Sequence, residues 1–484
     1  MRDVAVERHA HSGLRDLNSY SFVDALQQRR TRRVARGVSL QSKGLSHESQ
    51  NAPAPLTPLE EAILVVTTGI SGGAVMHDGP LEHPDGRYEL PTPFVNVFGR
   101  TGSSADNCQA TSFFLINDEG TWLIKRLQGR KALEFLREVP RKWSDWTEEH
   151  WLEAAAAVKH KLYDERLEYP RRFPYYIGWN NQHSNVPGST LLFPVVDCTY
   201  QYLNGIMIML SHPQDQRPLV IDDFSRFRPR SLLDWGAWLG SKLRLIDKIP
   251  YQPIGGIKHA KSGLVNPENF IPLGYGRTLR TDYEAFFLMQ NIMLMGEALG
   301  LGGWIHGSIM PPFVMQRDES KGFLGLGFRE HGPQIGEGPW APLPAGLPNF
   351  VGIDGVLEGL CPPYVDTDEA VDRLMEMKFG PDGCYGDKEI FARAYSNEAA
   401  AAEYLANAAP YKPEVVEYTK EICRYIYGKY GRFPAHVNAF YCPGMWIQFS
   451  HLELEYYEKY ADPSFFERQA RHDSVWHGGA GGTE

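Results

Sequence analysis

A run of basic residues near the start of the chain offers the first candidate chemistry. Arg29-Arg30-Thr31-Arg32-Arg33 follows Tyr20 to Gln28, a segment whose apolar residues have the spacing of a short amphipathic helix. Guanidinium groups make paired hydrogen bonds with phosphate oxygens, so such a run beside a helix that leads into a core could form an anion pocket. A targeting or polyanion-binding patch and a solvated helix end are the alternatives.

Hydroxyl and amide side chains are concentrated in a second segment, from Arg100 to Gln109. Ser, Asp and Asn are common in capped turns for backbone reasons, so a turn is one interpretation. The other is a binding site, because Asn107 and Gln109 both donate and accept hydrogen bonds and could bind the edge of a planar heterocycle. The residues alone favour neither.

Two further sequence patterns resemble the motifs of catalytic or metal sites. Gly69 to Gly73 matches G-x-S-x-G, but Thr57-Pro58-Leu59-Glu60 is a capping box, so the preceding segment is predicted to be a helix and Ser71 to lie in a loop. His451 and Glu455 would share one face of a helix, with His436 nearby, yet no H-E-x-x-H spacing is present. We interpret that region as an aromatic packing surface and assign no metal ligands.

The composition limits the class of protein. The 484 residues are 43% hydrophobic and 22% charged, which predicts a globular core and excludes disordered and fibrous classes. A net charge of -10 argues against binding to nucleic acid or anionic lipid. The six cysteines lack C-x-x-C spacing and indicate free thiols, while the start of the chain lacks a signal-peptide core. We expect a cytoplasmic protein without membrane or nucleic-acid partners.

Helices and strands alternate along the chain. Thr281-Asp282-Tyr283-Glu284 is a second capping box, followed by residues that are apolar on every side from Ala285 to Leu299 and by Gly300 as a stop, which predicts a helix buried in a core or an interface. Loops are predicted at 36–55, 70–93 and 330–365. The other predicted helices are Pro58 to Thr68, Ser144 to Lys161, 230–248 and Pro413 to Tyr427, and the predicted strands are Ala110 to Asn117, Thr121 to Lys125, Thr190 to Cys198 and Gly205 to Leu210.

Four segments, in this order, resemble the nitroreductase superfamily of flavin mononucleotide (FMN) oxidoreductases. They are similar to the opening helix with its R-R-S-x-R/K motif, the second helix, the P-S-x-x-N-x-Q loop, and the long central helix with its glycine stop. The pattern departs from the family at Ser103, which replaces the proline, and at His306, which replaces an often acidic residue. The four segments are Phe22 to Arg33, Leu56 to Ser71, Ser103 to Gln109 and Gln290 to Gly303.

The resemblance implies an α+β fold with a central, mostly antiparallel sheet flanked by helices and a long buried central helix. It also implies a homodimer with FMN sites at the interface. Carried over residue by residue, it assigns Arg29, Thr31 and Arg33 to the phosphate and polar ring edge, and Ser104, Asn107 and Gln109 to the isoalloxazine side. Ile305, His306 and Gly307 would lie near the reactive N5, and Arg432 is a candidate late phosphate contact, with Lys429 and Arg329 as alternatives.

The activity implied by the resemblance is ping-pong hydride transfer from NAD(P)H through FMN to a small organic acceptor. His306 is the candidate acid or base, since imidazole commonly titrates near neutral pH. One alternative is a flavin-dependent dehydrogenase or oxidase that uses O2 on a biosynthetic intermediate or peptide, and another is a scaffold or binding protein without cofactor. The predicted segments are an N-terminal tail (1–20), the first part of the core (21–127), an insertion-rich segment with a further strand (128–270), the central helix and second part of the core (271–330), and a C-terminal extension (331–484).

Overall fold

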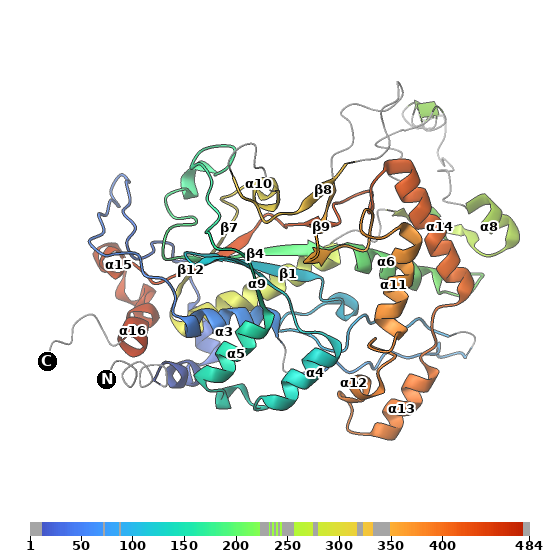
Figure 1. Cartoon of the computed structure of the whole chain (residues 1–484), viewed down its shortest axis with the longest axis horizontal. Coiled ribbons are helices and arrows are strands. Elements are labelled where there is room, and N and C mark those ends of the chain that lie inside the picture. The colour runs from blue at the N-terminus through green and yellow to red at the C-terminus, as the bar shows by residue number, and fades with distance from the viewer. Residues whose placement is uncertain are drawn as a thin grey trace.

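The computed structural model describes residues 12–70, 73–86, 89–222, 256–273, 279–316, 323–332 and 349–477, with positions 232, 235, 236, 239, 240 and 243 between them. Most of the helix predicted at 230–248 falls outside these residues. The described part is a mixed α+β structure built around one antiparallel sheet (Figure 1). The α+β class is therefore confirmed.

The main sheet has the order β3-β2-β1-β4-β12-β7, and β11 pairs with β4. The predicted hairpin is confirmed, because β1 and β2 pair antiparallel around a turn that joins Asn117 to Gly120. Strands far apart in sequence are neighbours at one side of the sheet, since β12 lies between β4 and the edge strand β7. The strands are β1 (Thr111–Asn117), β2 (Gly120–Ile124), β3 (Lys159–Tyr163), β4 (Thr190–Asp197), β7 (Gly302–His306), β11 (Phe440–Tyr441) and β12 (Trp446–Ser450).

Helices cover both faces of this sheet, because residues along β1 alternate between two cores. Phe113 and Leu115 pack on α3 (Pro58–Gly69), α5 (Glu148–Val158) and α9 (Leu279–Leu299). Phe114 and Ile116 pack on the other side, in the core that contains α6 (Thr199–Leu210) and α14 (Pro413–Tyr430). In Figure 1, α3 and α5 lie below the strands, whereas α11 (Thr367–Phe379) and α14 lie to their right.

Smaller elements complete the described chain. Two further sheets are present, one with the order β10-β9-β8 and one in which β5 and β6 pair in parallel. These elements are α2 (Phe22–Gln28), α4 (Gly129–Glu138), α8 (Gly256–Ser262), α10 (Pro311–Met315), α12 (Lys388–Ala392), α13 (Glu398–Asn407), α15 (Leu454–Tyr460), α16 (Glu467–Trp476), β5 (Pro218–Ile221), β6 (Asn266–Pro272), β8 (Arg329–His331), β9 (Asn349–Ile353), β10 (Leu357–Glu358) and the 3-10 turns Ala105–Asn107, Trp143–Asp145, Gly178–Asn180 and Pro463–Phe465.

Four predictions about local structure were wrong, in whole or in part. The strand predicted at Gly205 to Leu210 is the second half of α6, and its buried side chains recur at helical spacing. The loop predicted at 330–365 contains β8, β9 and β10. Residues 12–19, predicted as a tail, are helical. The helix predicted from Ser144 begins only at Glu148, because a 3-10 turn precedes it.

The central helix α9 begins earlier than its predicted capping box. It starts at Leu279, so Glu284 lies inside the helix and its carboxylate is free to bind another segment. The predicted stop is confirmed, because Gly300 has a φ of 89°, which glycine adopts without strain. One face of α9 is covered and the other is exposed in the single chain, where Tyr283 is 53%, Phe286 40% and Phe287 50% exposed.

The segment predicted as a C-terminal extension belongs to the core. It supplies β11 and β12 to the main sheet and α14 to one of the two cores that flank this sheet. Within the described part of the chain, every helix is too short or too polar to pass through a lipid bilayer.

Candidate functional site

The basic run lies in an extended segment along β7. The backbone N–H of Arg32 donates to the carbonyl of Gly303 at 3.2 Å. Its guanidinium is buried and forms an ion pair with Glu297 near the end of α9, at 2.7 Å, and also donates to the carbonyl of Phe465 at 2.6 Å. Arg32 therefore fixes the run against the core and is not available to a ligand.

The basic residues near Arg32 are less buried than Arg32 itself. Arg33 is exposed and Arg29 half-buried, and within the described chain neither has a carboxylate partner. The Arg33 guanidinium lies 5.7 Å from the ring centroid of Trp304, and Trp304 stacks on His306 at 3.9 Å. Thr31 is also exposed. Two of the predicted stretches, the basic run and the residues after the central helix, thus meet in one chain.

The surroundings of His306 correct its predicted role. Burial, assisted by the charge of Arg33, lowers the pKa of His306 to about 3, so the ring is neutral at pH 7 and is a poor proton donor. The N–H of Ser308 donates to Nδ1 at 3.3 Å, which leaves the ring proton on Nε2. That buried N–H, like Nε1 of Trp304, has no hydrogen-bond acceptor among the described residues. Ile305 and Gly307, its neighbours, are half-buried.

The hydroxyl and amide segment lies at the other end of α9, where Glu284 holds it. Oε2 of Glu284 accepts from Ser104 Oγ at 2.6 Å and from the N–H of Ala110 at 3.1 Å. Oε1 accepts from the N–H of Thr111 at 2.8 Å and from Arg100 at 2.9 Å. Ser104 therefore holds the loop to α9 through Glu284. The sequence analysis did not predict this contact, because it assigned Glu284 to a capping box at the start of the helix.

The amides of Asn107 and Gln109 are used inside the protein. Gln109 Nε2 donates to Asn107 Oδ1 at 2.8 Å, and Asn107 Nδ2 donates to the carbonyl of Asn96 at 2.5 Å. Arg100 Nε donates to Gln109 Oε1 at 2.7 Å. Asp106, Asn107 and Gln109 have φ values of 53°, 46° and 55°, a strained conformation for such residues. Strain of this kind persists where surrounding contacts impose it, often at functional sites.

The two halves of the predicted pocket do not meet within one chain. The loop from Ser104 to Gln109 is anchored at Glu284, and the basic run is anchored at Glu297 on the same helix. A rise of about 1.5 Å per residue places these anchors about 20 Å apart. Arg432 lies after α14, and its guanidinium donates to Asn438 at 2.6 Å. This hydrogen bond connects it neither to the basic run nor to the loop from Ser104 to Gln109.

A cluster of three histidines and one glutamate was missed by the sequence analysis. Glu60 at the start of α3 lies among His451 after β12, His472 in α16 and His477 just beyond it. These imidazoles hold the pKa of Glu60 well below its ordinary value, although burial alone would raise it. The histidines at 451, 472 and 477 lie in one late part of the chain, but Glu60 lies about 400 positions before them, so only the topology shows the cluster. His436 and Glu455 do not belong to it.

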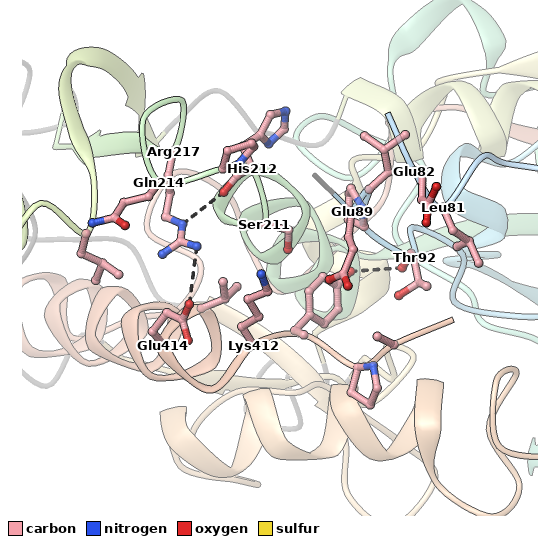
Figure 2. Close-up of a pocket in the computed structure, with 18 of the residues that line it drawn as sticks. Leu81, Glu82, Glu89, Thr92, Ser211, His212, Gln214, Arg217, Lys412 and Glu414 are labelled. Atoms are coloured by element: carbon pink, nitrogen blue, oxygen red, sulfur yellow. Dashed lines mark hydrogen bonds and ion pairs between the residues drawn. The ribbon is translucent and has the colours of Figure 1, made fainter. Parts of the chain in front are cut away.

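A cavity of about 870 Å³ opens elsewhere, between residues 81–86 and 89–92, the end of α6 and the start of α14. Figure 2 shows Arg217 on its wall, where Nε donates to the carbonyl of His212 at 3.4 Å and the guanidinium lies 3.7 Å from Glu414. Its lining mixes both signs of charge. The lining residues with acidic or basic side chains are Glu82, Glu89, His212, Arg217, Lys412 and Glu414.

A fully buried lysine lies behind this cavity. Lys378 Nζ donates to the carbonyl of Thr92 at 2.5 Å, to Asn204 Oδ1 at 2.8 Å and to the hydroxyl of Tyr411 at 2.8 Å. Burial lowers the pKa of Lys378 to about 7, since no carboxylate among the described residues forms an ion pair with it.

Comparisons with protein-family models, with curated proteins and with solved structures gave no match to this chain.

Proposed function

We propose that this protein is an FMN-dependent oxidoreductase of the nitroreductase type that works as a homodimer. The observation that supports it is the arrangement along α9. One apolar face of this helix is uncovered, with the strained loop Ser104 to Gln109 at its start, and with the half-buried Arg29 and the exposed Arg33 at its end.

A two-fold axis across α9 would join the halves of the pocket. If two copies of α9 packed antiparallel, the start of each helix would lie beside the end of the other, and the loop of one subunit would face the basic run of its partner. The apolar surface supports such packing, because large exposed patches mark interfaces. Its exposed members on α9 are Tyr283, Phe286 and Phe287, and the helix α2, which packs against α9, exposes Phe22, Val23 and Leu26.

The residues present fit the phosphate end of FMN better than its ring edge. Arg29 and Arg33 are uncommitted guanidiniums with Thr31 between them, which suits a phosphate dianion. Asn107 and Gln109 are already hydrogen-bonded inside the protein, so their part would be to hold the loop backbone in place for the ring. Bound FMN would supply hydride transfer from NAD(P)H to an organic acceptor.

The chain's own contribution would be binding and orientation. His306 is neutral and carries a buried Nε2–H without an acceptor in the described chain, so it would serve as a hydrogen-bond donor to a bound group and not as an acid. Trp304 stacks on this ring and under Arg33, and would exclude water from that side. Because five of the six free cysteines are buried and unpaired, we also infer a reducing compartment such as the cytoplasm.

Flavin content tests the proposal directly. The purified full chain is expected to be yellow, to hold about one FMN per chain, and to bleach on anaerobic addition of NADPH or NADH. The double variant Arg29→Ala/Arg33→Ala should lose FMN, whereas Arg172→Ala, an exposed arginine outside the pocket, should retain it. Flavin that neither nicotinamide reduces would favour the dehydrogenase or oxidase alternative. A colourless chain that takes up no added FMN would overturn the proposal and favour a scaffold.

A further inference from the structure

The cluster around Glu60 has the composition and spacing of a metal centre. Glu60 Oε1 lies 2.9 Å from His472 Nε2 and 3.0 Å from His477 Nε2, and these two nitrogens are 3.3 Å apart. His451 Nε2 lies 3.2 Å from Glu60 Oε2. A tetrahedral Zn²⁺ with bonds of about 2.0–2.1 Å has edges of about 3.3 Å between its ligand atoms. The observed separations are close to that value.

Hydrogen bonds on the far side of two imidazoles aim their free nitrogens at the centre. His472 Nδ1 donates to the carbonyl of Leu299 at 2.6 Å, and His451 Nδ1 donates to the carbonyl of Ala54 at 3.1 Å. A neutral ring that donates through Nδ1 has its lone pair on Nε2. Metal-binding histidines are oriented by the same kind of bond from the ring nitrogen that does not bind the metal.

The carboxylate oxygen at the centre is buried and accepts no well-aligned hydrogen bond. Glu60 is 0% exposed, and its Oε1 accepts no hydrogen bond from any residue in the described chain, because the nearby imidazoles are poorly aligned for one. Its Oε2 is occupied by the capping box, where it accepts from the N–H of Thr57 at 2.6 Å. Lone pairs from His472 and an anionic oxygen therefore face each other across a short distance, an arrangement that a divalent cation would stabilise.

The second cluster of this type differs in that respect. It consists of His47, Glu453 and Glu455. Both oxygens of Glu453 are already satisfied, since Oε2 accepts from the N–H of Gly37 at 2.8 Å and Oε1 accepts from Asn51 at 2.6 Å. The buried carboxylate of that cluster is therefore satisfied without a ligand, whereas Oε1 of Glu60 is not.

We propose that Glu60, His451, His472 and His477 bind one Zn²⁺ ion. Four protein ligands leave no open position, so the ion is structural, and it ties α16 to the start of α3 and to the end of β12. Entry is possible from the side of His477, whose side chain is 28% exposed. The site is independent of the proposed flavin function and is tested without it.

Metal content and affinity test the site on the full chain, prepared without a histidine tag. After removal of metal with EDTA, the wild type is expected to bind one Zn²⁺ per chain in a calorimetric titration with ZnCl₂. Bound Co²⁺ should show the visible bands of tetrahedral coordination, and Zn²⁺ should raise the melting temperature.

Three variants decide the outcome. Glu60→Gln keeps an acceptor for Thr57 and so preserves the helix start, but removes the anionic ligand. The single variants Glu60→Gln and His477→Ala should each lower the affinity for Zn²⁺ by more than about 10–100-fold. That is the loss typical when a hydrogen bond that orients a metal ligand is removed, and a ligand itself contributes more. His160→Ala, an exposed histidine on β3, should match the wild type. Equal Zn²⁺ affinity in the wild type and both ligand variants would overturn the proposal, as would a wild type that binds less than one Zn²⁺ per chain.

Discussion

Arg100 and Glu284 form an ion pair in which the guanidinium and the carboxylate are 2.9 Å apart and both side chains are almost completely buried. Arg32 and Glu297 form the same kind of pair near the other end of α9. Each pair connects this helix to a segment far away in sequence. A buried charge without its partner is strongly unfavourable, so each pair fixes the position of one predicted half-site relative to the helix.

The first prediction concerns the pair at the start of α9. Glu284→Gln preserves the shape of the side chain but leaves Arg100 without a buried counter-charge, so we expect a loss of about 3–5 kcal/mol in the free energy of unfolding. Urea denaturation measures it. Glu134→Gln, on the exposed side of α4, should change stability by less than about 0.5 kcal/mol. Equal stability of the two variants would show that the pair contributes nothing.

The second prediction separates two arginines that are adjacent in sequence. Arg32→Ala should destabilise the protein by about 3–5 kcal/mol, because burial already raises the pKa of Glu297 and the variant removes its cation. Arg33→Ala should change the free energy of unfolding by less than about 0.5 kcal/mol, since the side chain is exposed. Thermal and urea unfolding of both variants check this. Comparable losses in the two variants would contradict the assignment of Arg32 as the structural member.

The third prediction follows from the low pKa of Lys378. Between pH 7 and about 10 the unfolded chain holds one proton more at this lysine than the folded chain does, so its contribution to the free energy of unfolding rises with pH. The slope is at most about 1.4 kcal/mol per pH unit. Lys378→Met should remove this slope between pH 7.5 and about 9, whatever its effect on absolute stability. Lys412→Met, at an exposed site, should keep it. Identical slopes in wild type and Lys378→Met would refute the low pKa.

The fourth prediction tests the proposed dimer. Phe286→Glu/Phe287→Glu places two charges per subunit on the exposed face of α9, and a two-fold interface would bring four together. Sedimentation velocity should show a dimer for the wild type and a monomer for this variant. Leu45→Glu, at another exposed apolar position, should leave the dimer intact. A wild type that sediments as a monomer at micromolar concentration would remove the basis for a shared pocket.

The sequence predicted those elements whose signals are local. The predicted capping box at Thr57 and Glu60 is present, and β1 and β2 form the predicted hairpin with Asn117 paired to Gly120. The helix α6 was predicted in part as a strand, because a short apolar run such as Gly205 to Leu210 has no period that separates the two. The helix is favoured because it buries one face, which contains Leu203 and Met207, against β4 and α14. These partners are distant in sequence, so the local pattern does not reveal that burial.

The candidate site was predictable only in pieces. The order of the motifs placed the basic run near the residues that follow the central helix, and Arg33 does lie near Trp304. Nothing in the local sequence distinguishes Arg32 from Arg33. The difference comes from the ion pair between Arg32 and Glu297, which is distant in sequence. The expected role of His306 as an acid assumed a solvated ring, whereas the ring is buried. The zinc ligands were hidden because Glu60 already had an explanation as a capping residue.

The position of β12 between β4 and β7 affects how the protein folds during synthesis. In the described chain, the strand β7 is joined to the rest of the sheet only by β12, which also pairs with β4. The strands up to His306 therefore cannot form the complete sheet until the chain has been synthesised to Ser450. A nascent chain that stalls earlier would present the open edges of β4 and β7 to other chains, and such edges promote aggregation. Chaperone protection during synthesis would matter most over the stretch that precedes Trp446.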